Sequence, residues 1–147
     1  MFDELDKYEN NDHFFFTATD ALEKRCNAPA GKNGVYIVFT LKGGRIDMVY
    51  IGPSGKKLAD GSISTSSDSL KDTLINGHQF GKIPRKQSWP IQILSQNIEA
   101  LDVYWWVTYD EKYKDLPWDV ECIILNKYLE IYGVLPKWNK KYPKKLY

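Results

Sequence analysis

Two short apolar stretches, Gly34–Phe39 (GVYIVF) and Val49–Gly52 (VYIG), decide the fold of this 147-residue chain. Each has the length of a β-strand, and each holds one tyrosine close to one glycine. Gly43 and Gly44 lie between them, so the two stretches are predicted to form an antiparallel hairpin. Five apolar side chains alternate along the hairpin and predict one buried face: Val35, Ile37, Phe39, Val49 and Ile51.

The register of this hairpin determines where its two tyrosines lie. A two-residue Gly43-Gly44 turn would pair residue 36 with residue 51 and place Tyr36 and Tyr50 on opposite faces. An odd loop from Lys42 to Gly44, with a glycine in a bulge, would pair residue 36 with residue 50. Only the odd register puts all five apolar side chains on one face. We therefore expect the odd loop, with Tyr36 and Tyr50 as neighbours.

The remaining segments predict a mixed α/β (α+β) chain that forms one domain over residues 1–147. Residues 13–18 (HFFFTA), after a frayed N-terminal arm, are either a short strand or a buried apolar anchor. Residues 53–69 read as a polar loop. The other predicted elements are a helix from an N-cap at Thr19 to about Cys26, a helix near Leu70–Asn76, a strand over Leu101–Thr108, and a helix from Pro117 to about Tyr132.

The composition bounds the class of protein. Hydrophobic residues make up 43% of the chain, which is typical of a globular protein with a core. No segment approaches the roughly 20 apolar residues of a membrane span, and the acidic N-terminus does not resemble a secretory signal. Cys26 and Cys122 lack the spacing of a metal motif, so they are either reduced core residues or include one reactive thiol. We expect a cytoplasmic protein with no membrane partner.

The charge is unevenly distributed, although the net charge is only +1. Residues 1–12 form an acidic arm with five carboxylates and a single lysine. Residues 131–147 hold five lysines and no acid. Residues 140–147, at the end of this segment, form a basic tail. The basic end either faces the phosphates of a nucleic acid or is a solvated terminus.

Glu121 stands out on the last predicted helix. It shares one helical face with four apolar or aromatic residues: Ile124, Leu125, Tyr128 and Tyr132. A carboxylate there is either a first-turn residue favoured by the helix dipole or a metal ligand at the edge of a buried surface. The spacing alone leaves both interpretations open.

Taken together, these residues resemble the GIY-YIG nuclease superfamily. The resemblance rests on Gly34-Val35-Tyr36, Tyr50-Ile51-Gly52, Glu121 on a later helix, and Asn139 within PKWN, and it covers about residues 31–140. The chain is also similar to a group of small stand-alone bacterial members. The resemblance implies a three-stranded antiparallel sheet flanked by helices, and hydrolysis of DNA phosphodiesters with one divalent metal ion, Mg²⁺ or Mn²⁺.

The resemblance also implies roles for single residues. Glu121 would bind the metal, because hard divalent cations prefer oxygen ligands. Tyr36 would act as general base or water-orienting phenol, although a phenol with a pKa near 10 is a weak base at neutral pH. Tyr50 would orient the water or the phosphate, and Asn139 would hold the tail against the site. Gly34 and Gly52 would allow close approach of the backbone.

One position departs from the family pattern. The family has an arginine on the first helix after the second tripeptide, and Thr73 stands there in this chain. We therefore expect Thr73→Arg to raise cleavage at least tenfold, by analogy with single-donor losses elsewhere. Candidates that could supply the missing positive charge are Lys56, Lys57, Lys71, Lys82, Arg85 and Lys86. Candidate substrate-binding residues are Gly34, Gly52, Lys71, Arg85, Lys137 and Lys140.

The departure at Thr73 keeps other functions in view. The leading hypothesis is a metal-dependent DNA endonuclease. The second is a catalytically lapsed domain that binds nucleic acid or protein, and the third is a structural or inhibitor-like protein, which the low net charge favours. A homo-oligomer is compatible with all three. His78 is either an acid–base group or a partner of the helix dipole, and alternation predicts that Trp105 and Trp106 divide into one core residue and one exposed residue.

Overall fold

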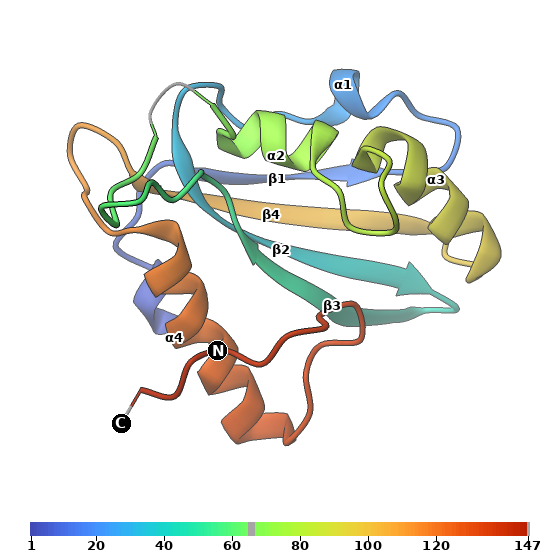
Figure 1. Cartoon of the computed structure of the whole chain (residues 1–147). Helices are drawn as coiled ribbons and strands as arrows, with labels where there is room; N and C mark the ends of the chain where they lie inside the picture. Colours follow the sequence, from blue (N-terminus) through green and yellow to red (C-terminus); the bar gives the residue numbers. More distant parts are fainter. Residues whose placement is uncertain (65–66, 147) are drawn as a thin grey trace.

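The computed structural model describes residues 1–64 and 67–146 and has an α+β fold built on one antiparallel sheet (Figure 1). The sheet has four strands in the order β1-β4-β2-β3. Their bounds are β1 (Asn11–Phe16), β2 (Asn33–Lys42), β3 (Arg45–Pro53) and β4 (Ala100–Tyr109). The expectation of three strands is wrong. The fourth strand is β1, where Phe14 and Phe16 alternate as buried residues and pair with β4.

Helices lie on both faces of the sheet (Figure 1). The short helices α1 (Leu22–Arg25) and α2 (Leu70–Asn76) and the longer α3 (Arg85–Ser95) cover one face. On the other face lie α4 (Pro117–Tyr132) and a single 3₁₀ turn, η1 (Asp3–Leu5). The structure confirms the bounds predicted for α2 and α4. Of the predicted loop 53–69, residues 65 and 66 lie outside the described part of the chain.

The hairpin places its tyrosines on one face by a route that the sequence analysis did not anticipate. Its loop is the two-residue turn, because Lys42 pairs with Arg45 and both Gly43 and Gly44 have positive φ. A bulge then shifts the register between Val38 and Phe39, so that Val38 pairs with Tyr50 and Tyr36 with Gly52. The predicted odd loop is therefore wrong. The predicted common face for the two tyrosines is confirmed.

The sheet separates two hydrophobic clusters. Tyr36 and Val38 face the cluster under α1, α2 and α3, whereas Val35 and Ile37 face the cluster under α4. Because of the bulge, Val49 joins the first cluster and not the face that it was predicted to share with Ile51. Of the two adjacent tryptophans, Trp105 is a core residue at 5% exposure and Trp106 is half-buried on the opposite face.

Two helical predictions fail for local reasons. The helix expected to begin at an N-cap on Thr19 begins at Leu22, with Ala21 as a cap that makes no side-chain hydrogen bond. Asp20 instead accepts hydrogen bonds from the backbone N–H and hydroxyl of Thr17, which closes a turn before the helix. Helix α3 was not predicted at all, because Pro90 lies inside it.

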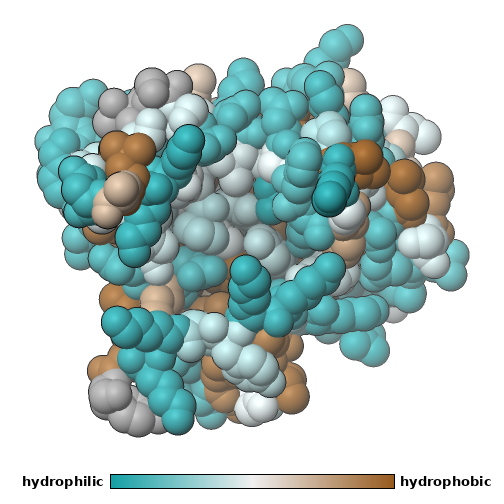
Figure 2. All heavy atoms as spheres, viewed as in Figure 1, coloured by the Kyte–Doolittle hydropathy of each residue, from teal (hydrophilic) through white to brown (hydrophobic). Residues whose placement is uncertain are grey.

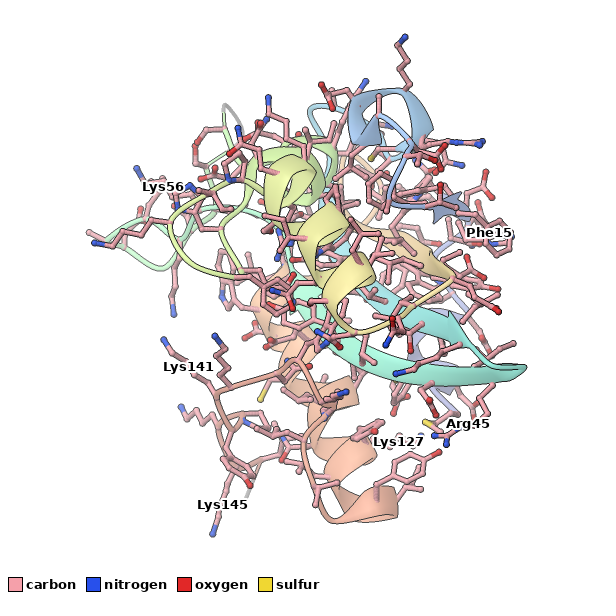
Figure 3. The ribbon with its side chains drawn as sticks, turned by 90° about the vertical axis from the view of Figure 1, so that its right-hand side faces the viewer. Phe15, Arg45, Lys56, Lys127, Lys141 and Lys145 are labelled. Atoms are coloured by element: carbon pink, nitrogen blue, oxygen red, sulfur yellow. The ribbon has the colours of Figure 1, made fainter. Side chains whose placement is uncertain are left out.

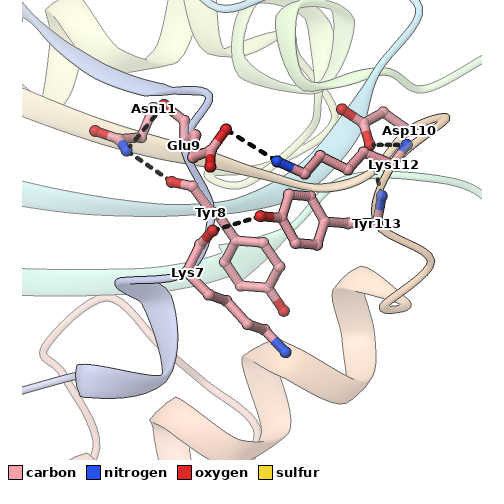
Figure 4. Close-up of polar contacts among 7 residues, drawn as sticks. All are labelled: Lys7, Tyr8, Glu9, Asn11, Asp110, Lys112 and Tyr113. Carbon is pink, nitrogen blue, oxygen red and sulfur yellow. Dashed lines mark hydrogen bonds and ion pairs between the residues drawn. The ribbon is translucent and has the colours of Figure 1, made fainter.

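The N-terminal arm packs against the rest of the protein and is not frayed (Figure 4). Leu5 and Tyr8 are each only 2% exposed. The hydroxyl of Tyr113 donates to the carbonyl of Lys7 at 2.7 Å, and Lys112 forms an ion pair with Glu9 at 3.1 Å. Acidic residues of the arm are therefore held against the loop that follows β4.

Candidate active site

Tyr36 and Tyr50 form an aromatic pair under α2 and α3. Their ring centroids are 5.9 Å apart, with 31° between the ring planes. Both rings lean over Gly52: a Cβ at this position would lie 2.5 Å from Cε2 of Tyr50 and 2.9 Å from the hydroxyl of Tyr36. Glycine at position 52 therefore leaves room for the two phenols, which accounts for the YIG tripeptide in terms of packing.

Gly34 has a different packing role at the start of β2. A Cβ there would collide with the backbone of β4 at Trp106. The N–H of Gly34 donates to the hydroxyl of Ser54 at 2.9 Å, and that hydroxyl donates to Asn33 at 2.9 Å. Gly34 thus allows β2 to approach β4 closely and fixes the segment after β3 beside the tyrosines.

Arg85, the first residue of α3, reaches into this cluster and is 3% exposed. Its Nη2 donates to the hydroxyl of Tyr36 at 2.7 Å, its Nε donates to Oε1 of Gln79 at 3.0 Å, and its Nη1 donates to the carbonyl of Thr73. The guanidinium carbon also lies 5.2 Å from the ring centroid of Tyr36 and 5.9 Å from that of Tyr50. Gly77 gives it space, because a Cβ there would collide with Nη1.

The charge of Arg85 is not neutralised by a carboxylate. Within residues 1–64 and 67–146, none of the ion pairs involves Arg85. A buried cation without a counter-ion is costly, and here only carbonyl, amide, phenol and aromatic groups surround it. Arg85 therefore supplies an uncompensated positive charge at the hydroxyl of Tyr36.

Tyr36 is neutral in this environment. Burial raises the pKa of its phenol well above the ordinary range, and the positive charge of Arg85 opposes that shift only in part. A neutral phenol can donate or accept a hydrogen bond, but it is a poor proton acceptor at neutral pH. Of the two roles that the resemblance implies for Tyr36, a neutral phenol suits the orientation of water better than the general-base role.

Glu121 lies in the second turn of α4, and its charge contributes to raising the pKa of Tyr36. It is half-buried, and burial raises its own pKa to about 7. None of the hydrogen bonds or ion pairs of the described residues satisfies its carboxylate. No group of three or more His, Cys, Asp or Glu side chains in the described part of the chain could hold a metal ion. Glu121 would thus be a single protein carboxylate for a metal that completes its shell with water and phosphate oxygens.

Asn139 connects the C-terminal segment to the outer edge of the sheet. Its Nδ2 donates to the carbonyl of Ile51 at 2.9 Å, and its Oδ1 accepts from the N–H of Ile51 at 3.0 Å. The neighbouring N–H of Trp138 donates to the carbonyl of Val49 at 2.8 Å. The side chain of Asn139 thereby pairs with β3 as another strand would, and it covers an edge that lies beside Tyr50.

The other sequence-predicted residues divide into two groups. Thr73 donates from its hydroxyl to the carbonyl of Asp68, and it lines a pocket of about 310 Å³ together with Asp68 and Asp72. Lys71 is half-buried, whereas Lys137 and Lys140 are exposed. In Figure 3, Lys56, Lys141 and Lys145 project from the same side of the molecule.

Gln79 and Trp89 also contact Arg85, and the sequence analysis missed both. Oε1 of Gln79 accepts from Arg85 and, at 2.9 Å, from the indole N–H of Trp89, so it fixes both side chains. Gln79 lies in the irregular segment between α2 and α3, where no periodicity marks it. Figure 2 shows that the surface is hollowed between the part formed by α2 and α3 and the part formed by α4 and the C-terminal segment.

The chain was compared with models of protein families, with curated proteins and with solved structures, and none of them matches it. No helix in the described part of the chain is long and apolar enough to cross a membrane.

Proposed function

We propose that this domain is a divalent-metal-dependent DNA endonuclease of the GIY-YIG type. In this chain Thr73 stands where that type has an arginine, and Arg85 would supply the missing positive charge. The observation that carries the proposal is the cluster of Tyr36, Tyr50 and Arg85, together with Glu121 on α4, whose charge acts on the phenol of Tyr36. It combines a buried cation without a counter-ion and a half-buried carboxylate without a partner. In metal-dependent phosphodiester hydrolysis, a carboxylate can hold the metal ion and a cation can stabilise negative charge on the phosphate.

Each residue has a role in that reaction. Glu121 would hold Mg²⁺ or Mn²⁺, which, when bound, would neutralise charge that develops on the phosphate. Tyr36 and Tyr50 would orient the attacking water and the phosphate through their hydroxyls. Arg85 keeps the hydroxyl of Tyr36 in place and would stabilise negative charge through its positive field. Asn139 would hold the edge of β3 in position beside Tyr50.

The DNA substrate would lie along the exposed lysines. The five lysines from 137 onwards are exposed, and none of the ion pairs of the described residues involves them. Lys56, from the loop after β3, projects on the same side as Lys141 and Lys145 (Figure 3). A DNA backbone on that side would meet positive charge from both segments.

The direct test is cleavage of supercoiled plasmid with Mg²⁺ or Mn²⁺. We expect wild-type protein to nick the plasmid and Glu121→Gln to lose at least about a hundredfold in rate, as expected for loss of a group that acts on transition-state charge. Glu130→Gln is the matched control, because Glu130 is an exposed carboxylate on the same helix. Equal activity of wild type and Glu121→Gln would contradict the role of Glu121.

A second candidate function is a binding domain without catalysis. The observation in its favour is that Tyr36 is 1% exposed and that its hydroxyl already bonds to Arg85, so substrate reaches it only if Arg85 moves. If plasmid stays intact under every metal condition while the protein still binds DNA or another protein, this reading replaces the first.

A further inference from the structure

The face of the sheet opposite Tyr36 is only partly covered. Helix α4 and η1 pack on Val35, Ile37 and Ile51, whereas Phe39, Met48 and Trp106 on the same face are only half-buried. A pocket of about 330 Å³ lies there, between the N-terminal arm and strands β2, β3 and β4. Its walls are Met1, Phe2, Leu5, Asp6, Ile37, Phe39, Ile46, Met48, Asp102, Tyr104 and Trp106.

Aromatic rings form a continuous row across this pocket. Phe39 meets Tyr104 edge to face with ring centroids 5.5 Å apart, and Tyr104 stacks on Trp106 at 6.1 Å. His13 stacks on the other side of Tyr104 at 4.5 Å. Phe39, Tyr104 and Trp106 are each half-buried, so part of their surface is free to contact a ligand.

The two charged side chains in the pocket wall have the same sign, and Met1, which carries the N-terminal ammonium, also lines the pocket. Asp6 and Asp102 are carboxylates, and the pocket has no lysine, arginine or histidine in its wall. Asp102 is anchored by Nδ1 of His13 at 2.8 Å, whereas Asp6 is exposed, and none of the hydrogen bonds or ion pairs of the described residues involves its side chain. Carboxylates beside aromatic faces attract a cation and repel phosphate, so this pocket does not suit a nucleic-acid backbone.

We propose that this pocket binds a small organic cation, such as a quaternary ammonium or alkylguanidinium compound. The exposed part of the Trp106 ring would contact the cation, beside the edge of Tyr104, and Asp6 and Asp102 would supply the opposite charge. A volume of about 330 Å³ is at the small end of the range for small-molecule sites. The site is separate from Tyr36 and Arg85, which lie on the other face of the sheet.

The test compares two probes of the same shape. Choline carries a trimethylammonium group, and 3,3-dimethylbutan-1-ol is its uncharged counterpart. At about pH 8, above the usual titration range of imidazole, we expect choline to shift the NMR signal of the Trp106 indole N–H saturably. We expect it to bind at least about tenfold more tightly than the alcohol, as a cation–π contact with charge complementarity provides.

Variants separate the proposed site from non-specific binding. Trp106→Leu and Asp102→Asn should each weaken choline binding at least about fivefold, whereas Trp118→Leu, a half-buried tryptophan outside the pocket, should leave it unchanged. Asp6→Asn provides a variant with an exposed side chain that does not endanger folding, and it should weaken binding as well. Equal affinity for choline and the alcohol, or unchanged choline binding in Asp6→Asn and Asp102→Asn, would overturn the proposal.

Discussion

At the scale of single residues, the contact between Arg85 and Thr73 bears on the arginine that was expected at position 73. The backbone carbonyl of Thr73 accepts a hydrogen bond from Arg85, so Arg85 contacts the position where the GIY-YIG pattern that this chain resembles has an arginine. The guanidinium of Arg85, on α3, thus contacts α2, the helix that has Thr73 where an arginine was expected. No sequence pattern links the two positions, since they are on different helices and their contact depends on how α2 and α3 pack.

The roles of Arg85 and Thr73 are testable as a pair. We expect Arg85→Lys to lower the cleavage rate by about 10²–10³, because lysine cannot reproduce the three-sided contact of the guanidinium. With Arg85 in place, Thr73→Arg should change the rate by less than about twofold, and this revises the tenfold gain that the sequence alone predicts. In the Arg85→Lys background, Thr73→Arg should restore part of the activity.

Two controls accompany that experiment. Arg85 is buried, so its substitution also removes one hydrogen-bond donor from Gln79 and one from Tyr36, and thermal unfolding must show that each variant is folded at the assay temperature. Added guanidinium salt at low concentration should partly rescue an Arg85→Ala variant. A tenfold gain from Thr73→Arg in the wild-type background would show that Arg85 does not supply the missing charge.

Glu121 makes a prediction about stability and pH. Its carboxyl titrates near 4.5 when unfolded and at about 7 when folded, because burial disfavours the charged form. The folded protein therefore keeps a proton that the unfolded chain releases, and stability that is fully present below about pH 4.5 is lost as the pH rises through about 7. In EDTA, the free energy of unfolding should fall by about 2 kcal/mol between about pH 5 and pH 8 from this residue.

Glu121→Gln isolates that contribution. Denaturant unfolding across the same pH range should give a difference between wild type and Glu121→Gln that grows with pH, while Glu130→Gln should follow the wild type. A difference that stays constant from acidic to neutral pH would show that the carboxyl of Glu121 titrates normally.

At the scale of elements, the sequence predicts those parts whose signals are local. Helix α2 has a serine N-cap and a closing glycine, and α4 has proline at its start and Gly133, with φ of 73°, at its end. The face of Tyr36 and Tyr50 was also predictable, because it follows from burial. The bulge near Val49 was not predictable. A two-residue turn combined with a bulge places the side chains on the same faces of the hairpin as one loop with an odd number of residues.

The site was predictable to the extent that it rests on those elements. Tyr36 and Tyr50 lie on the hairpin, and Glu121 lies on α4, so their approach follows from the fold. Arg85 and Gln79 belong to α3 and to the irregular segment before it, where Pro84 and Pro90 conceal the helical pattern. Their contacts are tertiary, and no spacing rule in the sequence indicates them.

The C-terminal segment makes a prediction at this scale about DNA binding. Its backbone is anchored, because the carbonyl of Lys144 accepts hydrogen bonds from Asn126 and Cys122. Truncation would remove those contacts as well as charge, so Lys140, Lys141 and Lys145 are better changed to glutamine. If each contacts a phosphate, the slope of log affinity against log salt should decrease by about 0.9 for each lysine, or nearly 3 for all three.

The matched control for the segment is Lys24→Gln together with Arg25→Gln on α1, which remove exposed positive charge from another part of the surface. These changes should leave the salt slope unaltered. Identical slopes for wild type and the triple glutamine variant would mean that the basic tail is a solvated terminus.

At the scale of the whole molecule, strand β2 joins the two hydrophobic clusters. Its successive side chains alternate between them, Tyr36 and Val38 toward α2 and α3, and Val35 and Ile37 toward α4. Strand β4 and the edge strand β3 flank β2 on either side. Because both clusters contain side chains of β2, unfolding of β2 would expose the apolar side chains of both. The two clusters are therefore expected to unfold together.

This coupling can be measured with one substitution in each cluster. Leu74 on α2 and Ile124 on α4 are both fully buried, and truncation of either to alanine should lower the free energy of unfolding by about 2–5 kcal/mol. In each variant, tryptophan fluorescence, which reports largely on the cluster of Trp89, Trp105 and Trp138, should follow the same transition as far-ultraviolet circular dichroism. If Ile124→Ala instead shifted only the dichroism and left the fluorescence transition in place, α4 would unfold separately. Glu121 would then leave the neighbourhood of Tyr36 before the sheet unfolds, and the proposed site would be lost at temperatures where the rest of the protein remains folded.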